Sequence, residues 1–238
     1  MKYIPNFITS LNLTSGFIAI IFAANGDLVT ASWFILAAMI FDFLDGFSAR
    51  LLKAYSAIGK ELDSLADVVS FGVAPGLIIY QLLNDSLSLS APINDADSIK
   101  TFLIMIIPAI MPVCGALRLA IFNLDTTQSS TFKGLPIPAN ALAVISVVIA
   151  AEYSHSTFFS SFTGSPLAMI LLALISSGLM VTRIPLISMK VTNLKLKGNE
   201  GRLILAGLVL VSFAFLGFNA APLIIPFYIL SSMIALLF

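Results

Sequence analysis

Cysteine and histidine are almost absent from this chain of 238 residues, which contains one of each, Cys114 and His155. A single cysteine excludes an internal disulfide and a CxxC motif, and one cysteine with one histidine cannot make a Cys/His zinc site. Catalytic schemes that need two histidines are excluded as well. Carboxylates are the side chains that remain for chemistry.

Charge is also scarce, because Asp, Glu, Lys and Arg make up 10% of the residues, against about 25% in a typical soluble domain. Twelve basic and twelve acidic residues give a formal net charge of zero, so we expect no overall attraction to nucleic acid. Apolar residues make up 59% of the chain, and the mean hydropathy is +1.04. Too little polar surface remains to cover a water-soluble protein, so the composition predicts an integral membrane protein.

The apolar residues gather in stretches near the roughly 20 residues needed to cross a membrane. We predict an all-α fold, a polytopic transmembrane helical bundle with about eight spans that forms one domain over residues 1–238. The spans are expected at 5–24, 28–52, 60–83, 99–122, 136–153, 165–183, 202–218 and 221–238. The N-terminus lacks the charged region and cleavage site of a signal peptide, so we expect the first span to be retained.

Basic residues predict the orientation, because Lys and Arg are found preferentially in short cytoplasmic loops. With eight spans and both termini in the cytoplasm, every basic residue except Lys100 falls on the cytoplasmic side. Acidic residues lie in or beside the outer loops: Asp27, Asp85, Asp95, Asp97 and Glu152. The pattern is typical of a prokaryotic-type cytoplasmic membrane protein with its polar hairpin turn at 50–60 in the cytoplasm.

Ionisable residues within the apolar stretches are concentrated where the second span ends and the third begins. Such a group costs several kcal/mol in a membrane unless it is paired, hydrated or bound to an ion. Helical periodicity places these residues on two facing stripes. The stripes contain Asp42, Asp45, Gly46, Ala49 and Arg50 on the second span and Gly59, Asp63 and Asp67 on the third. The four carboxylates fall at matching levels of the hairpin, roughly 6 to 15 Å inside its cytoplasmic end.

Four carboxylates at this position repel one another by about 1 to 4 kcal/mol per pair at ~4 Å. Divalent cations relieve the repulsion, and all-oxygen ligands favour Mg²⁺, Mn²⁺ or Ca²⁺ over zinc or copper. We therefore expect Asp42, Asp45, Asp63 and Asp67 to bind two such ions. The small residues leave room for a bulky group, and Arg50 offers a guanidinium suited to a phosphate oxygen. Two metal ions beside such a cleft suit phosphoryl transfer.

The eight residues match, in every position and spacing, the D-x2-D-G-x2-A-R-x8-G-x3-D-x3-D signature of the CDP-alcohol phosphatidyltransferases, and the chain resembles this family. The resemblance implies a six-helix core and a site for a CDP-linked lipid and divalent metal at the cytoplasmic face. It also implies a catalytic hairpin at 28–83, last helices at 202–238 peripheral to the core, and a homodimer.

The surrounding sequence resembles the membrane phosphatidylserine synthase branch of the family. The similar stretches are 5–6 with 12–13, 41–50, 63–75, 118–123 and 132–136. One departure is Ile121, where the branch often has a second arginine. The resemblance implies transfer of a phosphatidyl group from CDP-diacylglycerol to the hydroxyl of L-serine, with release of CMP, in a site surrounded by membrane lipids.

The resemblance also assigns roles to single residues. Asp42, Asp45 and Asp63 match the metal-binding aspartates, and Asp67 matches the general base that also touches a metal. Four further residues match positions that accommodate the CDP moiety: Gly46, Ala49, Arg50 and Gly59. Arg118 and Lys133 are weaker candidates for binding the serine carboxylate or a phosphate, since both also fit a role in anchoring the chain at the cytoplasmic face.

Other functions fit parts of the pattern. The same chemistry with glycerol 3-phosphate or inositol phosphate as acceptor would bring an extra phosphate, which calls for a richer basic pocket. A transporter could also hold carboxylates in the membrane, but no inverted repeat is evident in the sequence. A structural ion pair with Arg50 would explain one aspartate and leave three unexplained.

Overall fold

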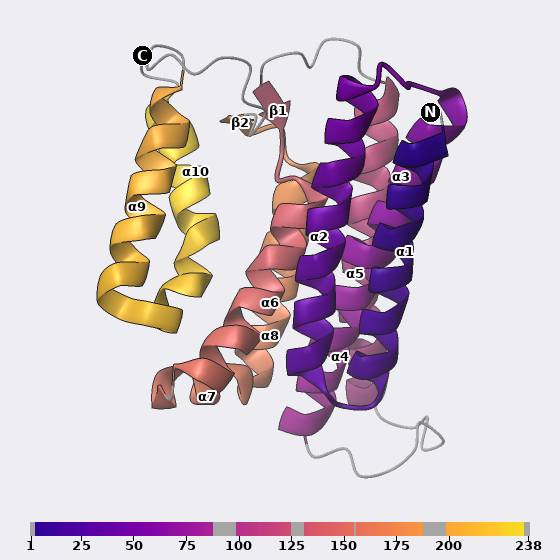
Figure 1. Ribbon diagram of the computed structural model, residues 1–238. Coiled ribbons are helices and arrows are strands. Elements are labelled where there is room, and N and C mark those ends of the chain that lie inside the picture. Colours follow the sequence, from indigo (N-terminus) through magenta and orange to yellow (C-terminus); the bar gives the residue numbers. More distant parts are fainter. Residues whose placement is uncertain (1–2, 88–98, 125–130, 155, 188–198, 236–238) are drawn as a thin grey trace.

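Helices account for most of the residues that the computed structural model describes, which are 3–87, 99–124, 131–154, 156–187 and 199–235 (Figure 1). In chain order the elements are α1 (Tyr3–Ala24), α2 (Leu28–Leu51), α3 (Ala57–Asp67), the π-helical η1 (Val68–Val73), α4 (Ala74–Ser86), α5 (Ile99–Leu124), β1 (Thr131–Lys133), α6 (Ile137–Tyr153), α7 (Thr157–Thr163), α8 (Pro166–Val181), β2 (Pro185–Ile187), α9 (Glu200–Leu216), the 3₁₀ segment η2 (Gly217–Leu223) and α10 (Ile224–Ala235). The predicted all-α bundle is confirmed.

The helices begin at residues whose side chains or geometry favour a helix start. Asp27 accepts a hydrogen bond from the Thr30 amide at 3.0 Å at the start of α2, and Ser56 accepts one from the Gly59 amide at 2.9 Å at the start of α3. Both side chains satisfy an amide that the helix itself leaves unpaired. Gly26 precedes α2 with a φ of +82°, a conformation that glycine adopts without strain.

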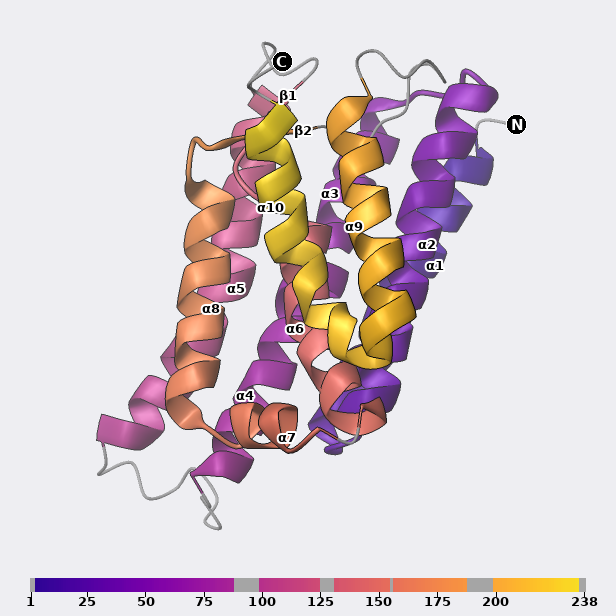
Figure 2. The same cartoon turned by 90° about the vertical axis from the view of Figure 1, so that its left-hand side faces the viewer.

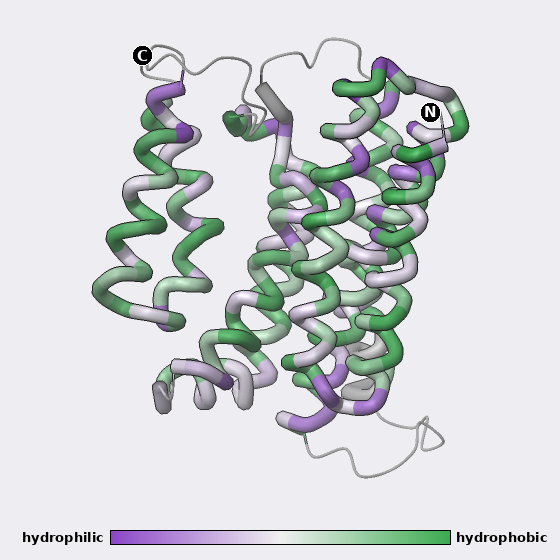
Figure 3. The backbone as a smooth tube through the Cα atoms, in the orientation of Figure 1, coloured by the Kyte–Doolittle hydropathy of each residue, from purple (hydrophilic) through white to green (hydrophobic). Residues whose placement is uncertain are grey.

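Five helical stretches are long and apolar enough to cross a membrane, and six if α7 and α8 count as one bent span. The chain is therefore an integral membrane protein. All eight predicted segments are helical, but α6, α8, α9 and α10 have only 12 to 17 residues each in the described part of the chain. The number of eight crossings thus stays a prediction. Figure 3 shows the hydrophilic residues gathered towards the ends of the helices.

With the short helix α7 counted together with α8, six helical stretches of the described residues precede the last pair of helices, in agreement with the six-helix core that the resemblance implies. They are α1, α2, the continuous α3–η1–α4 helix, α5, α6 and α8. The α2–α3 turn, β1 and β2 lie at one end of the bundle, and the first turn of α1 and the last turn of α10 lie at this same end (Figure 1). Lys190, Lys195 and Lys197, which contributed to the predicted orientation, lie outside the described residues.

A short antiparallel ladder closes this end of the bundle, where Phe132 of β1 faces Leu186 of β2. Gly134 follows β1 with a φ of +79°, and its amide donates to the carbonyl oxygen of Ile184 at 2.9 Å. A Cβ atom at Gly134 would lie 2.7 Å from the carbonyl oxygen of Thr182, so only glycine fits the turn. The ladder thus ties the segment before α6 to the segment after α8.

Close packing of α1 against η1 positions the polar end of the bundle. The buried face of α1 carries small and polar residues: Pro5, Thr9, Asn12, Ser15, Gly16, Ala19 and Ala23. A Cβ atom at Gly16 would lie 2.7 Å from the Cα atom of Ser70. The Ser70 hydroxyl donates a hydrogen bond to the carbonyl oxygen of Asn12 at 3.1 Å. Small residues at a helix contact let two membrane helices approach closely.

We expect Gly16→Ala to lower the thermal unfolding temperature of the detergent-solubilised protein, because the added methyl group forces α1 away from η1. Overpacking of this kind costs typically about 1–3 kcal/mol. Gly178→Ala on α8 is the matched control, since nothing lies within 4 Å of the added Cβ atom there. Equal melting temperatures for Gly16→Ala and the wild-type chain would contradict the close contact.

Candidate active site

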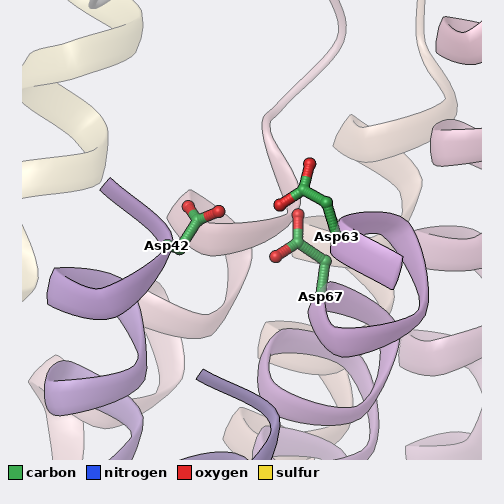
Figure 4. Close-up of side chains that lie close together, drawn as sticks. All are labelled: Asp42, Asp63 and Asp67. Carbon is green, nitrogen blue, oxygen red and sulfur yellow. The ribbon is translucent and has the colours of Figure 1, made fainter. Parts of the chain in front are cut away.

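Three aspartates converge between α2 and α3 at the end of the bundle that carries the α2–α3 turn. Asp42 comes from α2, and Asp63 and Asp67 come from successive turns of α3. Each offers one carboxylate oxygen, and these three oxygens lie within 4.8 Å of one another. Figure 4 shows the three carboxylates facing a common space between the two helices. The predicted facing stripes therefore bring these aspartates together.

Asp45, the fourth predicted carboxylate, lies about one turn further along α2 and is not part of this group of three. Its side chain is 5% exposed, and its Oδ2 atom accepts no hydrogen bond from the described residues. Its charge is still close enough to interact with those of Asp63 and Asp67. Asp45 thus adds negative charge beside the group, and its predicted role as a metal ligand stays a prediction.

Asn12 on α1 also reaches this group, which the sequence analysis did not foresee. Its side-chain Nδ2 donates to Oδ1 of Asp67 at 3.4 Å, and the residue is fully buried. The hydrogen bond occupies one oxygen of a carboxylate that is itself 7% exposed. The available signal was an asparagine between two leucines in an apolar helix, because a buried amide needs a polar partner.

The π-helical segment η1 begins directly after Asp67. Its wider turn places Ser70 against α1, where the serine hydroxyl bonds to the Asn12 carbonyl. Asn12 is therefore held by its backbone to η1 while its side chain contacts the last residue of α3. Single π-helical turns within α-helices occur frequently at functional sites.

The four residues predicted to accommodate a CDP group lie around the α2–α3 turn and differ in their surroundings. Gly46 has nothing within 4 Å of the place where a Cβ atom would stand, so space is open beside it. Gly59 lies instead against α1, where a Cβ atom would be 2.8 Å from Oδ1 of Asn6. Arg50 is exposed and Ala49 is half-buried. Space beside Gly46 and the exposed side chain of Arg50 are therefore open to a ligand, and all four roles stay predictions.

Arg118 and Lys133, the two weaker candidates, lie in different surroundings. Arg118 on α5 is 8% exposed, and its guanidinium carbon lies 5.9 Å from the centre of the Phe122 ring. Its charge also interacts with that of Asp67. Lys133 is exposed on β1, and Ile121 is 56% exposed on α5. Of the two candidates, Arg118 is buried and Lys133 is exposed, and both roles stay predictions.

Comparison with known proteins agrees with this geometry. The family model for CDP-alcohol phosphatidyltransferase matches residues 2–177 of the chain. The chain belongs to this family. The match includes every residue of the site described above and ends before α9, η2 and α10.

Several curated relatives are 34–37% identical to the chain over the aligned residues. A CDP-diacylglycerol–serine O-phosphatidyltransferase of Helicobacter pylori (strain J99 / ATCC 700824) is 37% identical over 153 residues, 63% of this chain and 59% of the relative. One of Bacillus subtilis (strain 168) is 36% identical over 145 residues, 61% of this chain and 75% of the relative. An archaetidylserine synthase of Methanothermobacter thermautotrophicus is 34% identical over 154 residues, which are 64% of this chain and 60% of the relative. The chain thus spans about 60% of the length of two of these relatives.

The aspartate group has the chemistry that a hard divalent cation requires. All its donors are carboxylate oxygens, the ligands that Mg²⁺, Mn²⁺ and Ca²⁺ prefer. Asp45 adds a buried oxygen with no hydrogen-bond donor among the described residues. Charges packed this closely in a low dielectric are unfavourable unless a cation or protons neutralise them. The residues therefore fit a divalent metal, as expected of this family.

We expect Asp42→Asn to weaken Mn²⁺ binding by at least about tenfold, equivalent to 1.4 kcal/mol, because the change removes one charged ligand and leaves the shape intact. Binding is measured by titration of the detergent-solubilised protein and followed by electron paramagnetic resonance. The matched control is Asp85→Asn, because Asp85 is exposed at the far end of α4. The same Mn²⁺ affinity in Asp42→Asn and the wild-type chain would contradict the metal site.

Proposed function

We propose that this chain transfers a phosphatidyl group from CDP-diacylglycerol to the hydroxyl of L-serine and releases CMP. The observation that carries the proposal is the convergence of Asp42, Asp63 and Asp67 in a member of this family. Buried Arg118 beside Asp67 gives the site a group of the opposite charge. The names of the H. pylori and B. subtilis relatives support serine as the acceptor.

Asp67 serves as the general base in this proposal. Its carboxylate accepts the proton of the serine hydroxyl, which is a poor nucleophile until a nearby base takes that proton. The serine oxygen then forms a bond to the phosphorus that carries diacylglycerol, and the bond from this phosphorus to the CMP oxygen breaks. Asn12 holds Oδ1 of Asp67, which leaves Oδ2 to receive the proton.

Asp42 and Asp63, with Asp67 and Asp45 beside them, would hold one or two divalent cations. When bound, such a cation neutralises negative charge on the diphosphate and on the departing CMP. Gly46 leaves space for the nucleotide next to these aspartates. Exposed Arg50 lies two turns beyond Asp42 on α2, where its guanidinium can bind a phosphate oxygen.

Arg118 is the proposed partner of the serine carboxylate. A buried guanidinium binds a carboxylate strongly because two parallel hydrogen bonds form away from water. Arg118 would bind the carboxylate of serine, and Asp67 would lie beside the serine hydroxyl. Glycerol 3-phosphate and inositol phosphate are alternative acceptors, although each brings a phosphate that calls for more basic residues than Arg118 supplies. The family match counts against the transporter reading.

An archaetidyl lipid is a second candidate donor, because one relative is named archaetidylserine synthase. Both donors would present the same diphosphate to the aspartates and differ only in the lipid chains. The acceptor would be serine in either case. A homodimer stays a prediction from the resemblance.

The proposed reaction is tested by incubating the purified protein and Mg²⁺ or Mn²⁺ with CDP-diacylglycerol or its archaetidyl counterpart. Parallel reactions contain L-serine, glycerol 3-phosphate or inositol phosphate, and mass spectrometry identifies the product. We expect phosphatidylserine and CMP in equal amounts, and no product in excess chelator. A phosphatidyl product from another alcohol, but none from serine, would refute the proposed acceptor.

The same assay with Asp67→Asn separates chemistry from binding. Loss of a positioned base typically costs about 10² to 10⁴ in rate, so we expect kcat to fall by this factor. We expect the affinity for CDP-diacylglycerol to change by less than about tenfold. Asp85→Asn again serves as the control. Turnover of Asp67→Asn near the wild-type rate would mean that the proton goes elsewhere.

We also propose that the aspartates face the cytoplasm, because the basic residues are concentrated at their end of the bundle. In a Cys114→Ser background, a membrane-impermeant maleimide should label Asn25→Cys on intact cells and should label Tyr55→Cys only after permeabilisation. Both residues are exposed, and they lie in the α1–α2 and α2–α3 turns at opposite ends of α2. Labelling of Tyr55→Cys from outside would reverse the orientation.

A further inference from the structure

The side-chain amide of Asn12 on α1 is satisfied at one end and not at the other. Its Nδ2 donates to Oδ1 of Asp67 at 3.4 Å, while its Oδ1 accepts no hydrogen bond from the described residues. The side chain is fully buried. A buried carbonyl oxygen without a donor loses its hydration and gains nothing in return, which is unfavourable. Oδ1 of Asn12 therefore needs a donor that the described part of the chain does not supply.

The chemistry of Asp67 determines which end of this amide faces it. An ionised carboxylate only accepts hydrogen bonds, so the amide must turn its NH₂ group towards Oδ1 of Asp67 and its own oxygen away from that atom. Oδ1 and Nδ2 of Asn12 are bonded to the same carbon and lie about 2 Å apart. The unsatisfied oxygen therefore lies beside the carboxylate that serves as the proposed base.

The contact between α1 and η1 holds Asn12 at this position. The Ser70 hydroxyl donates to the backbone carbonyl oxygen of Asn12 at 3.1 Å, and Gly16, one turn further along α1, packs against Ser70. Figure 2, like Figure 1, shows the start of α1 beside the α2–α3 turn. The amide thus reaches the aspartates from a third helix, whose backbone is fixed by close packing.

We propose that Oδ1 of Asn12 binds the ammonium group of the acceptor, so that Asn12 is a specificity-determining residue for an amino alcohol. This inference rests on the proposed function, in which L-serine is the acceptor and Asp67 is the base. Serine carries its hydroxyl and its ammonium group on neighbouring carbons, and Asp67 and Asn12 are neighbours in the site. The hydroxyl donates to Oδ2 of Asp67, and the ammonium group donates to Oδ1 of Asn12.

An ammonium group suits this oxygen better than the groups that other acceptors offer. A hydrogen bond from a charged donor is roughly twice as strong as a neutral one. Glycerol 3-phosphate and inositol phosphate carry only hydroxyls next to their reacting hydroxyl, so they would bind Asn12 more weakly. An amide oxygen also has no net charge, and it can select a cationic group without adding to the repulsion among the carboxylates.

The test compares L-serine with 3-hydroxypropionate, which has the same hydroxyl and carboxylate but no ammonium group. In the wild-type chain we expect kcat/KM to be at least about a hundredfold higher for serine, because the analogue leaves the Asn12 oxygen without a donor. In Asn12→Leu we expect this preference to fall by about ten- to hundredfold, the range for loss of a hydrogen bond to a charged group. Loss of the Asn12–Asp67 hydrogen bond affects both acceptors alike and cancels from the ratio.

The matched control is Ser15→Ala, because Ser15 is also buried on α1 and its hydroxyl donates to the carbonyl oxygen of Phe34 at 2.9 Å. We expect its preference for serine to equal that of the wild-type chain. Asn12→Ala removes the same amide without added bulk and gives the same comparison if Asn12→Leu does not fold. If Oδ1 binds a metal ion or a water molecule instead, both acceptors are affected alike and the preference stays unchanged.

An unchanged preference in the Asn12 variants would overturn the inference. An equal fall in Ser15→Ala would do the same, as would a wild-type chain that uses the two acceptors equally well. Failure of this inference can be told apart from failure of the proposed function. Absence of serine turnover by the wild-type chain overturns the function, whereas serine turnover with an unchanged preference in the Asn12 variants overturns only the role of Asn12.

Discussion

Repulsion among buried carboxylates is the constraint on which the rest of this structure depends. Asp42, Asp63 and Asp67 place oxygens within 4.8 Å of one another at one end of a membrane bundle, and Asp45 adds a fourth charge beside them. A low dielectric strengthens the repulsion between like charges. The fold opposes it with a hydrogen bond from Asn12 and the positive charge of Arg118. Both of these partners come from helices outside the aspartate hairpin, so the site depends on the bundle and not on the hairpin alone.

Close helix contacts at small residues fix the distances between the helices that carry the site. Gly16 lets α1 touch η1, and Gly72 and Gly76 let the same long helix touch α5, where added Cβ atoms would lie 3.0 Å from Pro112 and 3.1 Å from the Pro108 carbonyl oxygen. The first contact fixes Asn12 and the other two lie on the helix that carries Arg118. Backbone-to-backbone packing therefore sets the distances among the polar groups, since rigid backbones shift less than long side chains.

Much of this arrangement could be predicted from local sequence patterns. The apolar stretches predicted the helices, and the spacing of Asp42, Asp63 and Asp67 predicted that their carboxylates converge, because helical periodicity fixes which residues share a face. Asp45 lies outside this group of three, and its role as a metal ligand stays a prediction. The contribution of Asn12 depends on a contact between α1 and α3, because Asn12 and Asp67 lie 55 positions apart in the chain. No local pattern encodes such a contact between distant helices.

The π-helical segment after Asp67 changes the rotational phase of the long α3–η1–α4 helix. A π-helical turn accommodates an extra residue, which shifts every later side chain by about 100° around the axis relative to an uninterrupted α-helix. The stripe with Asp63 and Asp67 lies before this shift, and the buried face of α4 lies after it. The angle between these two faces therefore differs from the angle that an uninterrupted α-helix would give. Substitutions on α4 can therefore change how α4 packs in the membrane without changing the direction in which Asp63 and Asp67 face.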